Sequence, residues 1–133
     1  MYAQDFRTFV TGRIISSTAQ NANADLVYQV PDKQNASIDF ISVVNSNNNN
    51  RDAYLEIFDS SEVNSDDGSG PDTRYYFLLN NFQIGGNKRQ IVIDSNQVLH
   101  LHAGDQLRAS ASHSDQLYIV VSGRLVPEYL RNV

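Results

Sequence analysis

The chain has 133 residues, no cysteine and a formal net charge of −5 at pH 7. This length suits one domain with a hydrophobic core of its own. The lack of cysteine excludes disulfide bonds and thiolate metal sites. Nucleic-acid binding depends largely on lysine and arginine contacts to phosphate, and here 10 basic residues face 15 acidic ones. We therefore expect neither a nucleic acid nor an anionic membrane surface as a partner.

The sequence contains no apolar run that approaches the roughly 20 residues of a membrane-spanning helix. The segment MYAQDFRTFVTGR at its start lacks a basic region followed by an apolar region. We therefore expect no signal peptide, and we expect synthesis and folding in a cytoplasm.

Short runs of alternating apolar and polar residues, rich in β-branched types, recur along the chain, and helical periodicity is nearly absent. This pattern predicts β-strands. In chain order, the expected strands are Phe6–Ile15, Leu26–Val30, Ala36–Val44, Ala53–Phe58, Arg74–Leu79, Gln90–Ile93, Val98–Leu101, Leu107–Ser112 and Leu117–Gly123. About eight or nine short strands at this spacing predict an all-β protein, an antiparallel β-sandwich or jelly roll, in a single domain over residues 1–133.

The alternation also predicts which side chains share a face of a strand. The expected sets are Ala53, Leu55 and Ile57 opposite Tyr54, Glu56 and Phe58, and, in the next strand, Tyr75, Phe77 and Leu79 together. The connections include a polyasparagine hairpin tip at Asn47–Asn50, a hairpin turn at Gly85–Lys88 and a long acidic loop at Val63–Thr73. An α/β fold would need a crossover helix near Asp59–Asp72, where the cluster Gly68–Pro71 opposes one.

His100 and His102 alternate along one predicted strand and therefore project from the same face. Such a pair can chelate zinc or iron in cupin-type jelly rolls, but a metal site needs a third and usually a fourth ligand. The following residues, Ala103–Gln106, include no glutamate in the cupin position, and His113 is the only other histidine. We interpret the pair as half-exposed strand residues and predict no metal ligand.

Other candidate chemistry is sparse. Asn64–Gly68 together with Asp72 offers oxygen ligands for Ca²⁺, but the bidentate glutamate that closes an EF-hand loop is missing, so a solvated acidic loop is favoured. The sequence has no G-x-S-x-G motif, no cysteine nucleophile and no phosphate-binding loop. We predict a non-enzymatic protein with no catalytic residue and no cofactor.

The step Ala103-Gly104-Asp105 predicts a tight turn between two strands. Glycine accommodates such a turn, and an aspartate in it can accept hydrogen bonds from backbone N–H groups. We interpret these residues as part of the architecture.

Both chain ends, an arm over residues 1–12 and a tail over residues 125–133, are rich in apolar and aromatic residues. Burial of one large apolar side chain is worth about 1.5–3 kcal/mol, so these ends are poorly suited to remain in water. They can fold back on their own sandwich, or they can dock on a neighbouring subunit. For docking, the expected contact residues are Tyr2, Phe6, Phe9, Tyr129 and Leu130.

Several short motifs follow one another in a distinctive order. They are Gly12-Arg13-Ile14, Leu26-Val27-Tyr28-Gln29-Val30-Pro31, Ile41-Ser42-Val43-Val44-Asn45, the segment Leu101–Ser112 (LHAGDQLRASAS), and Leu117–Gly123. Over most of residues 12–124, this order resembles a group of small virion proteins of tailed bacteriophages. The chain departs from that pattern by an extra residue in the Leu-Val-Tyr step and by the long loop at Val63–Thr73.

The resemblance implies a non-enzymatic virion component with a β-sandwich fold. Such proteins decorate or cement capsids, often as homotrimers that bridge neighbouring subunits, or they serve in tails and baseplates. The leading hypothesis is a capsid decoration protein on the virion surface, with the major capsid protein and further copies of itself as partners. A tail or baseplate component and a carbohydrate-binding module are the alternatives. For the carbohydrate-binding module, Tyr54, Phe58, Tyr75, Tyr76 and Asn80 would contact the sugar.

Overall fold

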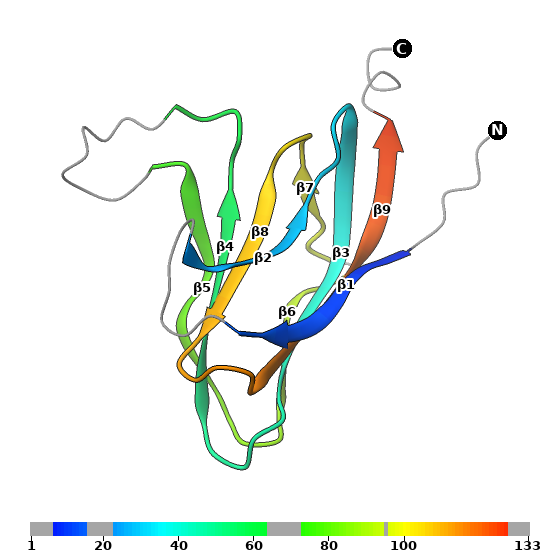
Figure 1. The fold of residues 1–133 in the computed structure, drawn as a ribbon. Helices are drawn as coiled ribbons and strands as arrows, with labels where there is room; N and C mark the ends of the chain where they lie inside the picture. Colours follow the sequence, from blue (N-terminus) through cyan, green and yellow to red (C-terminus); the bar gives the residue numbers. More distant parts are fainter. Residues whose placement is uncertain (1–6, 16–22, 64–72, 95, 128–133) are drawn as a thin grey trace.

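The computed structural model describes residues 7–15, 23–63, 73–94 and 96–127. Within these ranges the chain forms β-strands and no α-helix, and the strands make two antiparallel sheets that face each other (Figure 1). The strands are β1 (Arg7–Ile14), β2 (Asp25–Gln29), β3 (Gln34–Asn45), β4 (Arg51–Phe58), β5 (Tyr75–Ile84), β6 (Arg89–Ile93), β7 (Leu99–Leu101), β8 (Gln106–Ala111) and β9 (Leu117–Pro127). The predicted all-β sandwich is confirmed.

Sheet A has the strand order β1-β9-β3-β6, with β7 also paired to β3, and sheet B has the order β2-β8-β4-β5. β3 is paired along both edges, with β9 on one side and with β6 and β7 on the other. Among the described strands, β4 and β5 are the only consecutive ones that pair with each other. Most connections therefore pass from one sheet to the other.

The predicted hairpins at Asn47–Asn50 and Gly85–Lys88 are wrong. The first loop joins β3 of sheet A to β4 of sheet B, and the second joins β5 of sheet B to β6 of sheet A. Turn-forming residues indicate that the chain reverses, but they do not determine whether the next strand pairs with the previous one or crosses the core to the opposite sheet.

The core lies between the two sheets and is mainly aliphatic. Its buried residues are Ile14, Val30, Ala36, Ile38, Ile41, Val43, Ala53, Leu55, Leu79, Ile84, Ile93, Leu101, Leu107, Ala109, Ala111, Leu117, Ile119 and Val121. The predicted alternation of β4 holds, since Ala53 and Leu55 are each 1% exposed and Ile57 packs against the core. On the other face of β4, Glu56 is also 1% exposed and lies opposite Arg108 of β8.

The predicted common face of Tyr75, Phe77 and Leu79 is interrupted by an irregularity in β5. Phe77 lies opposite Glu56 of β4, whereas Leu79 lies opposite the core residue Leu55. The register shifts between these two pairs because β5 contains one extra residue there. The side chains that follow therefore point to the opposite face of the sheet from the one that strict alternation predicts. Leu79 therefore enters the core, while Phe77 on the outer face remains 42% exposed.

β1 and β9 include parts of the segments that the sequence assigned to the chain ends. Residues 7–12 belong to β1, and β9 continues past its predicted end at Gly123 to Pro127, which pairs with Gln34 of β3. Arg7 of β1 lies opposite Gly123. The start of β1 therefore lies beside β9 four residues before that strand ends at Pro127 (Figure 1).

Asn45 closes β3 and is 0% exposed. Its Nδ2 donates hydrogen bonds to the backbone oxygens of Asn49, Ile84 and Gly85 at 2.8, 3.0 and 3.2 Å. Its Oδ1 accepts a hydrogen bond from the backbone N–H of Asn47 at 2.9 Å. One buried amide therefore joins the loop after β3 to the end of β5.

The loop Asn47–Asn50 packs tightly on the turn between β5 and β6. The backbone N–H of Asn87 donates to the backbone oxygen of Asn47 at 2.9 Å, and the Asn87 side chain donates to Oδ1 of Asn48 at 2.8 Å. A Cβ atom on Gly86 would lie 2.1 Å from the backbone oxygen of Asn48. The close approach of the two loops therefore requires glycine at this position.

We predict that Asn45→Ala lowers the free energy of unfolding by about 2–3 kcal/mol, because it leaves buried carbonyl groups without their donor. Urea denaturation followed by far-UV circular dichroism measures the change. Asn96→Ala, at an exposed loop position, is the matched control and should change stability by less than about 0.5 kcal/mol. Equal stability of the two variants would contradict the role assigned to Asn45.

We predict that Gly86→Ala lowers stability by about 1–3 kcal/mol, because the new methyl group must push the two loops apart. Gly12→Ala is the matched control, since a Cβ atom at Gly12 meets nothing within 4 Å. In a strand this change should be neutral or stabilise by up to about 1 kcal/mol. Thermal unfolding of both variants tests the difference. If Gly12→Ala loses stability and Gly86→Ala does not, the explanation is refuted.

Candidate functional site

The turn between β7 and β8 is built around Asp105, which is 4% exposed. Its Oδ2 accepts the backbone N–H of His102 at 2.8 Å. Its Oδ1 accepts both the backbone N–H and the hydroxyl of Ser60, at 2.9 and 2.8 Å. Gly104 has φ +86°, a left-handed conformation that glycine adopts without strain. The predicted turn and the predicted role of its aspartate are confirmed.

The backbone of this turn also contacts the end of β2. The N–H of Val30 donates to the carbonyl of Asp105 at 2.9 Å, and the N–H of Gly104 donates to the carbonyl of Val30 at 3.0 Å. Four segments therefore meet here: the end of β2, the loop after β4, the end of β7 and the start of β8. The turn fixes His102, and with it the short strand β7, against the edge of β3.

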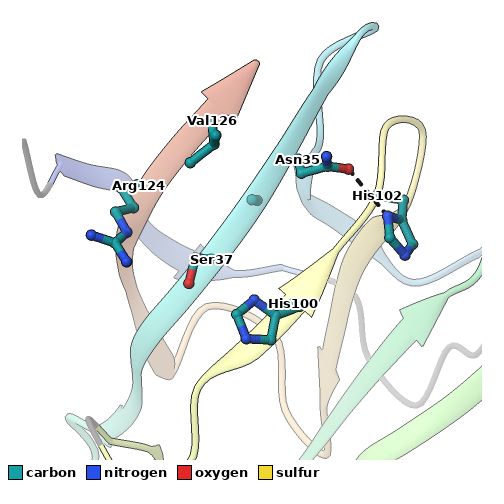
Figure 2. Close-up of a pocket in the computed structure, with 7 residues that line it drawn as sticks. Asn35, Ser37, His100, His102, Arg124 and Val126 are labelled. Carbon is teal, nitrogen blue, oxygen red and sulfur yellow. Dashed lines mark hydrogen bonds between the residues drawn. The ribbon is translucent and has the colours of Figure 1, made fainter. Parts of the chain in front are cut away.

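A depression on the outer face of sheet A lies directly beside this turn and has a volume of about 410 Å³. It is lined by side chains from three neighbouring strands, β9, β3 and β7, and by His102, which follows β7 (Figure 2). Ser37 of β3 lies at its centre, with Arg124 of β9 and His100 of β7 as its two direct cross-strand partners. These three residues form the first row of the site.

A second row runs parallel to the first, two residues along each strand. Asn35 of β3 lies opposite Val126 of β9 on one side. On its other side, Oδ1 of Asn35 lies 3.1 Å from Nδ1 of His102 (Figure 2). This contact holds the His102 ring beside Asn35.

The described lining of the depression includes one arginine, two histidines and no acidic residue, in a protein whose net charge is −5. His100 and His102 are both exposed, while Leu101 between them is 3% exposed and faces the core. The two imidazoles share a face as predicted, but both are exposed rather than half-exposed, and His102 lies just after β7, which ends at Leu101. The arrangement suits hydrogen bonding to a polar or anionic ligand.

In the part of the chain that the structure describes, no group of three or more His, Cys, Asp or Glu side chains could hold a metal ion. The depression supplies two imidazoles and no carboxylate, whereas a stable zinc or iron site needs further ligands. The acidic segment at residues 64–72, considered above for Ca²⁺, lies outside the described residues.

The aromatic residues considered for sugar binding lie on sheet B. The rings of Phe58 and Tyr75 are 5.0 Å apart, and the Arg74 guanidinium lies 5.1 Å from the Phe58 ring centre. The Tyr54 hydroxyl donates to Oδ1 of Asn81 at 2.9 Å, so the amide that the structure brings to Tyr54 is not that of the predicted Asn80.

Tyr76 is 48% exposed at the edge of sheet B. Desolvation raises the pKa of its hydroxyl, and the nearby carboxylates of Glu62 and Asp59 raise this pKa further. Tyr76 therefore has two acidic neighbours, whereas the described lining of the depression on sheet A includes no acidic residue.

Of the residues expected to contact a partner, Tyr2, Phe6, Tyr129 and Leu130 lie outside the described residues. Phe9 lies in β1, between Thr8 and Val10, where the register with β9 shifts. Sequence reasoning identified His100 and His102 but missed Asn35, Ser37, Arg124 and Val126. Polar Asn35 and Ser37 alternate with buried Ala36 and Ile38, and this pattern indicates that one face of the strand is exposed. It does not reveal which strands lie beside it.

No protein-family model, curated protein or solved structure matches the chain. The described residues include no helix that is long and apolar enough to span a membrane.

We predict that Asp105→Ala lowers the free energy of unfolding by about 2–4 kcal/mol, because three donors lose a charged acceptor. Urea denaturation measures the loss. The rate of backbone amide hydrogen exchange should increase most at residues 99–106 and at Ser60. Asp32→Ala, at an exposed turn position, is the control and should remain within about 0.5 kcal/mol of the unmodified protein. Unchanged exchange at Ser60 would contradict the bridging role.

Proposed function

We propose that this protein is a non-enzymatic structural component of a bacteriophage virion, a capsid decoration protein that bridges neighbouring major capsid protein subunits. The observation that supports the proposal best is the antiparallel pairing of β1 with β9, the first and last of the described strands. Arg7 lies opposite Gly123, and β9 continues four residues further to Pro127, so the start of β1 and the end of β9 point towards the same end of this strand pair. Apolar segments that continue from both strands can then contact one neighbour together.

The resemblance to tailed-phage virion proteins supports the same proposal. Its motif positions coincide with residues that build the framework here: Asn45 joins two loops, and Gly104 and Asp105 join four segments. A motif with such roles encodes a β-sandwich body rather than a catalytic site.

In this proposal the sandwich is a rigid body, and the chain ends attach it to the capsid. Burial of apolar side chains from the ends across the boundary between two capsid subunits would hold those subunits together, since apolar burial drives most protein association. Further copies of the chain, arranged as a homotrimer, would act at the same boundary.

The test uses virions of the phage whose genome encodes the chain. We expect mass spectrometry to detect the protein in purified virions and cryo-electron microscopy to place it on the head shell. Deletion of residues 1–6, which leaves β1 intact, should abolish its binding to capsids that lack it. Density confined to the tail would replace this proposal with a tail or baseplate role, and absence from virions would refute both.

A carbohydrate-binding role is the second candidate, and the aromatic edge of sheet B favours it. Tyr76, Phe77 and Phe82 are 48%, 42% and 39% exposed, which is unusual for large aromatic side chains. Aromatic rings with nearby amides suit the apolar faces and hydroxyl groups of sugars. Binding on a glycan array that Phe77→Ser abolishes would support this candidate, and a blank array would remove it.

A further inference from the structure

β5 is an edge strand without the charged side chains that usually protect an edge. In sheet B it pairs only with β4 among the described strands. The free edge of a sheet can pair with another chain, and proteins commonly prevent this with charged residues. The strands at the other ends of the two sheet orders, β1, β2 and β6, each contain a charged residue, whereas the ten residues of β5, YYFLLNNFQI, contain none. The composition of β5 therefore suits contact with another chain.

Three large aromatic side chains of β5 are exposed: Tyr76 at 48%, Phe77 at 42% and Phe82 at 39%. Tyr76 lies opposite Ile57, which packs against the core, and Phe77 lies on the outer face of the sheet. Phe82 lies opposite the core residue Ala53. Tyr76 and Phe82 therefore project from the inner face, so aromatic rings line this edge on both faces. Exposed aromatic side chains are enriched at protein interfaces.

The start of β5 has acidic neighbours. The backbone N–H of Asp59 donates to the carbonyl of Arg74, the residue before β5, at 2.8 Å. The backbone N–H of Glu62 donates to the carbonyl of Asp59 at 3.3 Å, so a second carboxylate lies in the same loop. The Arg74 guanidinium lies 5.1 Å from the centre of the Phe58 ring. Two carboxylates and one guanidinium give this end a net negative charge among the described residues.

The other end of β5 has basic neighbours. Lys88 lies in the turn that follows β5, and Arg89 begins β6. Both residues are exposed. Arg51 and Asp52 of β4 lie opposite the last two residues of β5, and their charges offset each other. The described residues at this end therefore have a net positive charge, so the two ends of β5 are opposite in charge.

An antiparallel arrangement of two copies matches these features. When two β5 strands lie side by side about a two-fold axis through the middle of the strand, Phe77 of each copy lies beside Phe82 of the other. The acidic start of each strand then lies beside Lys88 of the other copy, so opposite charges meet twice. The register shifts within β5 interrupt a continuous backbone ladder, so side chains supply most of the contact.

We propose that two copies of this chain associate through their β5 edges in this antiparallel arrangement. β5 lies on the opposite side of the molecule from β9 (Figure 1), so the contact is independent of the proposed attachment to a capsid. A two-fold contact uses the same patch on both copies and joins them in pairs, so it links one homotrimer to the next. It covers the aromatic edge of sheet B and therefore competes with a sugar at that surface.

The test is sedimentation equilibrium of the full chain over a range of protein concentrations. We expect a monomer–dimer equilibrium. Phe77→Lys should weaken dimerisation at least about tenfold, because it buries a charge without a partner. Asn80→Asp, at an exposed position beside the two-fold axis, should also weaken it by placing like charges together, and it serves if Phe77→Lys fails to fold. Leu26→Lys is the matched control, since Leu26 is 48% exposed on the opposite edge strand of sheet B.

A charge exchange tests the antiparallel orientation. Lys88→Glu should weaken dimerisation about tenfold, because the new carboxylate lies beside Glu62 of the other copy. The double variant Lys88→Glu/Glu62→Lys restores the attraction, and its dissociation constant should return to within about threefold of that of the unmodified chain. Lys33→Glu, at an exposed turn position, is the control and should leave dimerisation unchanged. A double variant that does not recover overturns the proposed orientation.

A chain that remains monomeric at every concentration overturns the proposal, and so does a dimer that neither Phe77→Lys nor Asn80→Asp weakens. If the chain alone is monomeric but Phe77→Lys abolishes its binding to capsids, the β5 edge contacts a capsid subunit instead of a second copy. Dimerisation of the isolated chain does not require a virion. Absence of the protein from virions therefore refutes the capsid proposal and leaves the β5 contact standing.

Discussion

The buried carboxylate of Asp105 is the interaction on which one end of the sandwich depends. It accepts two hydrogen bonds from Ser60 and one from the backbone of His102, while its own backbone pairs with Val30. A buried charge is stable only when donors replace the lost water. The segments that supply these donors come from both sheets, so the same requirement that stabilises the carboxylate also fixes how the sheets meet.

The depression on sheet A follows from this constraint. β7 has three residues and pairs only with β3 among the described strands, so its pairing alone is a weak anchor. The turn at Asp105 holds its end through the N–H of His102. As a result His100 lies opposite Ser37, and His102 reaches Asn35. A structural aspartate thus sets the geometry of the depression on the outer face of sheet A.

Asn45 has a corresponding role at the other end of the molecule. Its amide donates to the end of β5, and its oxygen accepts from the loop after β3. A polyasparagine loop is usually interpreted as a flexible tip, but here Gly86 allows it to pack closely on the next turn. Buried polar side chains at both ends therefore connect loops that the strands leave unpaired, while the aliphatic core between them supplies most of the stability.

The sequence by itself determined the nine strand segments, the all-β class, the common face of His100 and His102 and the turn at Asp105, because alternation, turn residues and glycine act locally. Only the tertiary structure decided that Asn47–Asn50 crosses between sheets, that Leu79 enters the core after a shift in register, and that Arg124 and His100 flank Ser37. Strand order depends on burying the inner faces of both sheets against each other at once. That requirement acts between residues far apart in the chain, so no local pattern records it.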